Sequence, residues 1–196
     1  MSSSIKAASP QLPVHRIVTK HTECGQSTHG IVDHITPVAS NISGVHGAAL
    51  WTTDKAQHND LSTQSDDAAK RVISDRFGLV VNNGSNLRVT DLPPGSITPL
   101  HRTHSVDYNI LIHGSVFHIT EDGTETHLTT PGATLIQRGT MHAWENRGTE
   151  WARYISVLID AEPISLPDSR GKLVPAPEVM SDGWVPPSRK KMSSKL

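Results

Sequence analysis

The sequence predicts an all-β protein, a single antiparallel barrel or sandwich with a strand-containing arm before it and a tail behind it. Beyond residue 78, short runs of β-favouring residues follow one another at intervals of about 8–12 residues, as in β-sandwiches and barrels. Turn-forming sequences separate these runs, namely Asn83-Gly84, Pro93-Pro94-Gly95, Asp122-Gly123, Pro131-Gly132 and Arg147-Gly148. The chain has no internal repeat, so the pattern predicts one barrel and not two.

The first part of the chain is predicted to contain little packed core. Residues 1–13 are rich in Ser, Ala and Pro, which predicts disorder. Residues 14–84 contain β-favouring runs such as HRIVTKH and GAALWTT between Gly, Ser, Asn and Pro, and are predicted to be a strand arm and loop. Within them, residues 54–71 are polar and lack an apolar stripe, which predicts a loop with one helical turn near Asp66–Val72.

The barrel core is predicted to span residues 85–160. The clearest hairpin signal there is Asp122-Gly123, which lies between the runs VFHIT and THLTT. Residues 161–196 are Pro-rich and end in Ser and Lys, so we expect a tail that lies along the barrel.

The composition bears on the class of partner. A formal net charge of −1 provides no electrostatic basis for binding nucleic acid or an anionic membrane. No apolar run approaches the roughly 20 residues of a membrane span, and the N-terminus lacks the apolar stretch of a signal peptide. The single cysteine, Cys24, excludes an intramolecular disulfide framework and suits a reducing compartment. We therefore expect a small-molecule substrate, with no nucleic acid and no membrane as partner.

The segment HRTHSVDYNILIHG carries the first candidate site motif. Gly95 is followed after five residues by His101, and Asp107 is followed after six by Gly114. This spacing resembles the first motif of the cupin superfamily, which are small jelly-roll barrels. Thr103 stands where the second histidine of that motif belongs, and Asp107 stands where the family has glutamate.

A second segment resembles the other cupin motif. Pro131-Gly132 leads to Gly139, and His142 and Asn146 follow at the spacing of that motif. The proline that the family places between them is absent here. The amino-acid sequences of the two motifs, with HRIVTKH and ALWTTD upstream, resemble those of small single-barrel cupins found beside fungal and bacterial biosynthetic genes. The resemblance implies a single cupin jelly-roll barrel and a homodimer that pairs through an edge and exchanges its N-terminal arm.

The resemblance and the residue types together indicate a metal site. Two histidines and one carboxylate with open positions form a common site for Fe(II), and Mn, Zn or Ni can occupy similar sites. His101, Asp107 and His142 supply that set, so we expect a divalent metal ion as cofactor. The alternative is a degenerate cupin in which these three residues only form hydrogen bonds inside the barrel.

Other residues near the motifs are candidates for substrate binding or catalysis. His104 is a candidate acid or base, or else a surface histidine, and Tyr108 is a candidate proton donor, or else barrel packing. Arg102 could bind a substrate carboxylate, and Thr103 would leave one metal position open. Trp144 shares the face of the motif histidine, and could line the pocket beside a ring-containing substrate or simply pack in the core.

These residues, together with the resemblance to cupins of biosynthetic gene clusters, imply an enzyme that acts on a carboxylated or 1,3-dicarbonyl, polyketide-like intermediate, most simply as a metal-dependent decarboxylase or another lyase. A metal ion would stabilise the enolate that forms. The alternatives are an Fe(II) dioxygenase, a metal-free acid/base cyclase, dehydratase or isomerase, and a cupin that binds a small molecule without chemistry.

The chain ends with Ser194-Lys195-Leu196. C-terminal S-K-L is an address read by the peroxisomal import receptor. We therefore expect that receptor as a partner and the peroxisome as the location, with the cytoplasm as the alternative.

Overall fold

The computed structural model describes residues 12–40, 42, 44–55, 67–73 and 77–187. The described residues form strands and one short 3-10 turn, η1 (Ala68–Lys70), so the predicted all-β class is confirmed. That turn lies in the segment where one helical turn was predicted. Asp66 and most of the segment predicted to be disordered lie outside the described residues. No helix in the described ranges is long and apolar enough to cross a bilayer.

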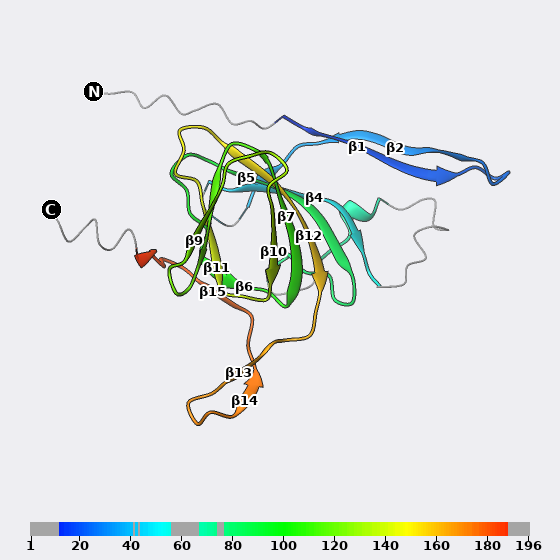
Figure 1. Ribbon diagram of the computed structural model, residues 1–196. Helices are drawn as coiled ribbons and strands as arrows, with labels where there is room; N and C mark the ends of the chain where they lie inside the picture. The colour runs from blue at the N-terminus through cyan, green and yellow to red at the C-terminus, as the bar shows by residue number, and fades with distance from the viewer. Residues whose placement is uncertain (1–11, 41, 43, 56–66, 74–76, 188–196) are drawn as a thin grey trace.

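Two antiparallel sheets enclose the core (Figure 1). The first has six strands in the order β10-β7-β12-β5-β4-β3. Its strands are β3 (Val38–Ala39), β4 (His46–Thr53), β5 (Ser85–Leu92), β7 (Ser105–His113), β10 (Thr134–Arg138) and β12 (Ala152–Asp160). Strands β3 and β4 come from the segment predicted as an N-terminal arm, and here they extend the barrel sheet.

The second sheet has five strands in the order β15-β6-β11-β8-β9. It consists of β6 (Leu100–Arg102), β8 (Val116–Thr120), β9 (Glu125–Leu128), β11 (His142–Glu145) and β15 (Val179–Ser181). The predicted hairpin at Asp122-Gly123 joins β8 to β9, and the Asp122 carboxylate accepts hydrogen bonds from Thr120 and Thr124. Strand β15 comes from the predicted tail and pairs with β6, so the C-terminal segment forms part of this sheet.

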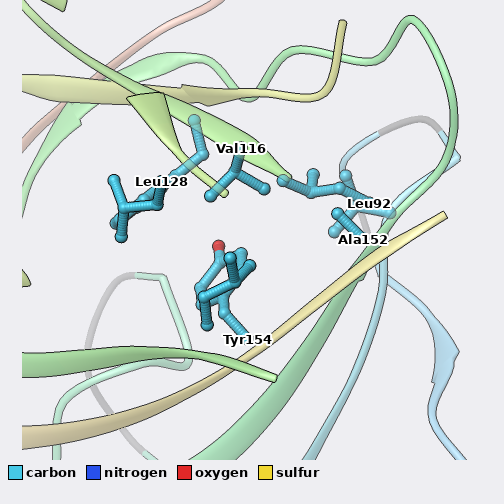
Figure 2. Close-up of a cluster of buried hydrophobic side chains, with 8 residues drawn as sticks. Leu92, Val116, Leu128, Ala152 and Tyr154 are labelled. Carbon is cyan, nitrogen blue, oxygen red and sulfur yellow. The ribbon is translucent and has the colours of Figure 1, made fainter. Parts of the chain in front are cut away.

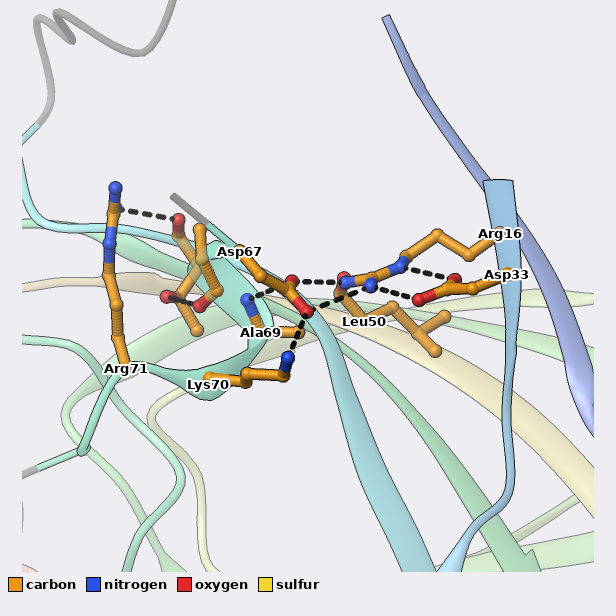
Figure 3. Close-up of polar contacts among 9 residues, drawn as sticks. Arg16, Asp33, Leu50, Asp67, Ala69, Lys70 and Arg71 are labelled. Carbon is orange, nitrogen blue, oxygen red and sulfur yellow. Dashed lines mark hydrogen bonds and ion pairs between the residues drawn. The ribbon is translucent and has the colours of Figure 1, made fainter. Parts of the chain in front are cut away.

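Two hairpins lie outside these sheets. Strands β1 (Val14–His21) and β2 (Ser27–Ile35) form a ribbon that projects from the barrel, and β13 (Ser165–Pro167) pairs with β14 (Leu173–Pro175) (Figure 1). The base of the β1–β2 ribbon is held by Arg16, whose guanidinium lies between Asp33 and Asp67 and donates to both carboxylates (Figure 3). Arg16 also donates to the Leu50 carbonyl, so one buried cation joins β1, β2, β4 and the residue before η1.

Buried and more exposed residues alternate along the strands, and the buried ones form the core. On β7 and β12, every second residue is buried, as expected where one face of a sheet packs against another. The buried cluster joins both sheets and includes Leu92, Val116, Leu128, Ala152 and Tyr154 (Figure 2). Trp144 of β11 stacks on Tyr154 of β12 with ring centroids 4.9 Å apart, a direct contact between the sheets.

Candidate functional site

A cavity of about 520 Å³ lies between the two sheets. The five-stranded sheet contributes His101, His142, Trp144 and Met180 to its wall. The six-stranded sheet contributes polar side chains from three neighbouring strands, namely Arg88, Thr90, Asp107, Asn109, Tyr154 and Ser156. A volume of this size accommodates a small-molecule ligand.

His101 and His142 form a close imidazole pair in this cavity. They are opposite each other in the β6–β11 ladder, and their ring centroids lie 4.2 Å apart. The Nδ1 atom of His101 lies 2.8 Å from the Pro99 carbonyl oxygen, and that of His142 lies 3.1 Å from the Thr140 carbonyl oxygen. A carbonyl only accepts hydrogen bonds, so Nδ1 must donate in both rings. In the neutral rings Nε2 therefore carries a lone pair, which can take a proton or bind a metal ion.

Burial keeps these rings neutral. Desolvation lowers the pKa of His101, and it lowers the pKa of His142 well below its ordinary value. The neighbouring His101 and His118 lower the pKa of His142 further, because a second positive charge nearby disfavours protonation. The pair is thus uncharged at neutral pH and available as a base.

Asp107 lies on β7 and lines the same cavity. Burial raises the pKa of its carboxyl to about 6, against the opposing effects of a hydrogen bond from Ser105 and the positive charge of Arg88. Its Oδ1 atom is buried without a hydrogen-bond partner among the described residues. A carboxyl with this pKa can both accept and donate a proton near neutral pH.

The two histidines suit a metal ion better than the full predicted set does. Metal-binding histidines usually donate their other ring N–H to a carbonyl or carboxylate, as His101 and His142 do here. However, no group of three or more His, Cys, Asp or Glu side chains in the described part of the chain is arranged to hold a metal ion. His101, Asp107 and His142 therefore share one cavity as predicted, but they do not form a three-ligand site in this structure.

Two predicted catalytic residues, His104 and Tyr108, are not among the residues that line the cavity. His104 follows the end of β6, and its Nε2 bonds to the Ala176 carbonyl while its backbone N–H donates to Glu178. It therefore anchors the C-terminal segment. Tyr108 is on the outer face of β7, with its side chain 41% exposed, because its neighbours in the strand, Asp107 and Asn109, occupy the inner face.

Of the three predicted substrate-binding residues, only Trp144 lines the cavity. Arg102 is buried outside the cavity, with its guanidinium 3.8 Å from the Glu121 carboxylate. The Thr103 hydroxyl is hydrogen-bonded to the Ser105 hydroxyl. Strand β6 ends at Arg102, so the regular alternation that predicted Thr103 on the same face as His101 does not continue. Neither Arg102 nor Thr103 is among the residues that line the cavity.

The motifs did not indicate the polar residues of the opposite wall, above all Arg88, Asn109 and Ser156. Each shares strand parity with other inward residues, but parity alone does not show which strands are neighbours. His118 is a further histidine beside the site that the motifs did not indicate. His118 is buried, donates through Nε2 to Gln137 Oε1 at 2.7 Å, and stacks with His142 at 5.3 Å between ring centroids.

Comparison with known proteins places the chain among fungal relatives. The phomopsin biosynthesis cluster protein D of Diaporthe leptostromiformis is 33% identical over 172 residues, which is 85% of this chain and 89% of that protein. The cupin-domain-containing oxidoreductase virC of Hypocrea virens is 38% identical over 93 residues, 46% of this chain and 47% of virC.

Among solved structures, the polyketide cyclase RemF of Streptomyces resistomycificus matches 74% of this chain and 76% of its own, with a TM-score of 0.43 and 15% identity. No protein-family model matches the sequence. The relationship to the phomopsin cluster protein extends over most of both chains, and the match to virC carries the cupin domain. This chain therefore belongs to the family of cupin-domain proteins encoded in fungal secondary-metabolite clusters.

Proposed function

We propose that the protein is an enzyme of fungal secondary metabolism that moves a proton on a small carboxylated or 1,3-dicarbonyl intermediate. The observation that carries this proposal is the pair of buried, neutral imidazoles with Nε2 free, in one cavity with a carboxyl group of pKa about 6. Perturbed ionisable groups that converge in a cavity favour chemistry over binding alone.

The proposed step is proton abstraction next to a carbonyl. Nε2 of His101 or His142 takes the proton, and the electron pair moves onto the carbonyl oxygen to form an enolate. The positive charge of Arg88 faces this cavity and stabilises the enolate. Asp107 then returns a proton to carbon or oxygen. Isomerisation, cyclisation and dehydration of a dicarbonyl compound all proceed through such a step.

A metal-dependent decarboxylase or other lyase is the second candidate, and the anchored histidine tautomers favour it. His101 and His142 would supply two nitrogen ligands, and Asp107 would supply the third after a shift of its side chain. A bound Fe, Mn, Zn or Ni ion would act there as a Lewis acid toward an enolate oxygen. The name of virC also keeps an Fe(II) dioxygenase among the alternatives, and oxygen consumption identifies that reaction.

The experiment that separates these candidates follows deuterium uptake from D₂O into levulinate and 3-oxoglutarate by NMR. Metal-stripped protein and protein reconstituted with each metal are compared, with CO₂ and O₂ measured in parallel. We expect exchange by the stripped protein and its loss in His142→Ala. Exchange or CO₂ release only in reconstituted protein, with stoichiometric metal that His142→Ala fails to retain, would establish the second candidate. Binding of both compounds without turnover in any form would contradict both and leave a binding protein.

We further propose that the peroxisomal import receptor carries the protein into peroxisomes. This proposal is supported by Ser194-Lys195-Leu196 alone, which lie outside the described residues. The cytoplasm is the alternative location.

A further inference from the structure

Three polar residues of the six-stranded sheet form a continuous row across neighbouring strands. Asn109 of β7 is opposite Ser156 of β12, and Ser156 is opposite Arg88 of β5. All three line the cavity, on the sheet that faces the His101–His142 pair. Residues opposite each other in adjacent strands point to the same face, so the row presents its side chains together.

Within this row, Ser156 sets the orientation of the Asn109 amide. The Ser156 hydroxyl lies 2.6 Å from Asn109 Oδ1, and it must be the donor because an amide oxygen only accepts. The Nδ2 group of Asn109 is then left as a donor, and it has no hydrogen-bond partner among the described residues although Asn109 is only 3% exposed. Buried polar groups are nearly always paired, so an unpaired amide in a cavity wall calls for a ligand with an acceptor atom.

The third member of the row adds positive charge. Arg88 acts electrostatically on His101, Asp107 and Tyr154, all of which line the cavity. On the adjacent strand β4, a Cβ atom at Gly47 would lie 2.9 Å from the Arg88 guanidinium, so the absence of a side chain at Gly47 leaves room for this group. A guanidinium and an amide donor that line one cavity together favour a ligand with anionic oxygens over a cation.

We propose that Asn109, Ser156 and Arg88 form an oxyanion subsite that holds the carboxylate of the substrate, with Asn109 as the donor, Ser156 as a positioning residue and Arg88 as the source of positive charge in the same cavity. The proposal assigns a substrate class, a carboxylate, to the proposed active site. It rests on the proposed function only for the use of this subsite in catalysis. A substrate anchored here extends from the polar wall toward the histidines, with Trp144 available to contact a ring.

Benzoate and benzamidine test this subsite, because they have nearly the same shape and opposite charge. Their affinities for the full-length protein are measured by ligand-observed NMR for wild type, Asn109→Asp and Asn82→Asp. Asn109→Asp retains the oxygen that accepts from Ser156 and replaces the free donor with an anionic acceptor. Asn82→Asp makes the same chemical change at an exposed turn residue and serves as the matched control.

We expect wild type to prefer benzoate, and Asn109→Asp to weaken benzoate binding by about tenfold or more and to improve benzamidine binding. Asn82→Asp should behave as wild type, and loss of both ligands would instead report a damaged fold, which circular dichroism detects. In that case Ser156→Ala replaces Asn109→Asp as the test and should weaken benzoate alone. Equal wild-type affinities for the two ligands, no wild-type binding of benzoate, or an unchanged preference in the variants would overturn the inference. Because binding is measured without turnover, the two tests are independent. The benzoate test can overturn the subsite while deuterium exchange still supports the proposed function, and loss of exchange can overturn the proposed function while benzoate still binds at the subsite.

Discussion

The imidazole rings of His101 and His142 lie 4.2 Å apart between centroids, adjacent in register on β6 and β11, with each Nδ1 bonded to a backbone carbonyl. Two buried rings at this separation cannot both carry a positive charge without strong repulsion. The pair therefore behaves as one base that accepts a single proton. The pair lines the same cavity as Trp144 of its own sheet and Asp107 of the opposite sheet.

The first prediction concerns stability in acid. His101 and His142 have folded-state pKa values below the unfolded value of 6.5, so the unfolded chain binds protons more readily. The free energy of unfolding should therefore fall as the pH drops below about 6.5. His142→Asn retains a donor toward Thr140 and removes one titrating ring, so urea denaturation at a series of pH values should show a shallower fall. His113→Asn, at an exposed histidine, is the control, and equal slopes in the two variants would contradict the prediction.

The second prediction concerns Asp107. Its folded-state pKa of about 6 lies above the ordinary value of 3.8, so ionisation destabilises the fold progressively between these two pH values and fully above about 6. Asp107→Asn should raise the free energy of unfolding at pH 8 by up to about 3 kcal/mol, with the gain vanishing toward pH 4. The same variant should lose the proposed proton transfer.

A control of opposite sign is available on the β8–β9 turn. Hydrogen bonds from Thr120 and Thr124 lower the pKa of the Asp122 carboxyl, so its ionised form stabilises the fold. Asp122→Asn should therefore destabilise the protein at pH 8. If Asp107→Asn and Asp122→Asn changed the free energy of unfolding at pH 8 in the same direction, the raised pKa of Asp107 would be refuted.

The third prediction compares two glycines with positive φ angles, Gly114 at +73° and Gly132 at +88°. A Cβ atom at Gly114 would lie 2.6 Å from the Trp151 carbonyl oxygen, whereas one at Gly132 would meet nothing within 4 Å. Both alanine variants carry the backbone strain, but only Gly114→Ala adds a collision with backbone. Gly114→Ala should cost about 1–3 kcal/mol more than Gly132→Ala in thermal unfolding. Equal losses would mean that the chain around Trp151 relaxes freely.

The fourth prediction is a homodimer that forms through the outer face of the six-stranded sheet, in place of the edge pairing that the family resemblance implies. Tyr108 and Ile136 are opposite each other on β7 and β10 and are 41% and 51% exposed, and Ile112 and Ile159 add further exposed apolar area on the same sheet. A sheet face open to water usually carries polar residues, so this face is expected to be covered by a second copy. Light scattering should find a dimer for wild type and a monomer for Ile136→Glu.

Leu173→Glu, at a residue 65% exposed on the separate β13–β14 hairpin, is the control for that measurement and should remain dimeric. A monomeric wild type at micromolar concentration would contradict the prediction. A monomer for Leu173→Glu would place the interface elsewhere.

The fifth prediction concerns location. With a fluorescent protein joined to its N-terminus, the chain should gather in peroxisomes of a fungal cell, because the receptor reads the last three residues. Deletion of Ser194-Lys195-Leu196 should leave it diffuse in the cytoplasm. Identical distributions of the two fusions would show that these residues do not act as an address.

The sequence alone determined the all-β class, and it identified four of the residues that line the cavity. Turn signals and β-favouring runs are local properties, so they could be recognised without a structure, and the motif spacing predicted His101, Asp107, His142 and Trp144 as pocket residues. All four line the cavity. These residues are close to turns or on regular strands, where local spacing and parity predict the inward direction.

Only the tertiary structure decided the remainder of the site. His104 lies within the first motif and was a candidate acid or base, or else a surface histidine. The regular strand ends at Arg102, and the His104 ring donates through Nε2 to the Ala176 carbonyl of the C-terminal segment. Arg88, Asn109 and Ser156 converge because β5, β12 and β7 are neighbours in a particular register, which is a long-range property that no local pattern encodes. The pKa shifts of His142 and Asp107 likewise depend on burial, which exists only once the two sheets have closed around these side chains.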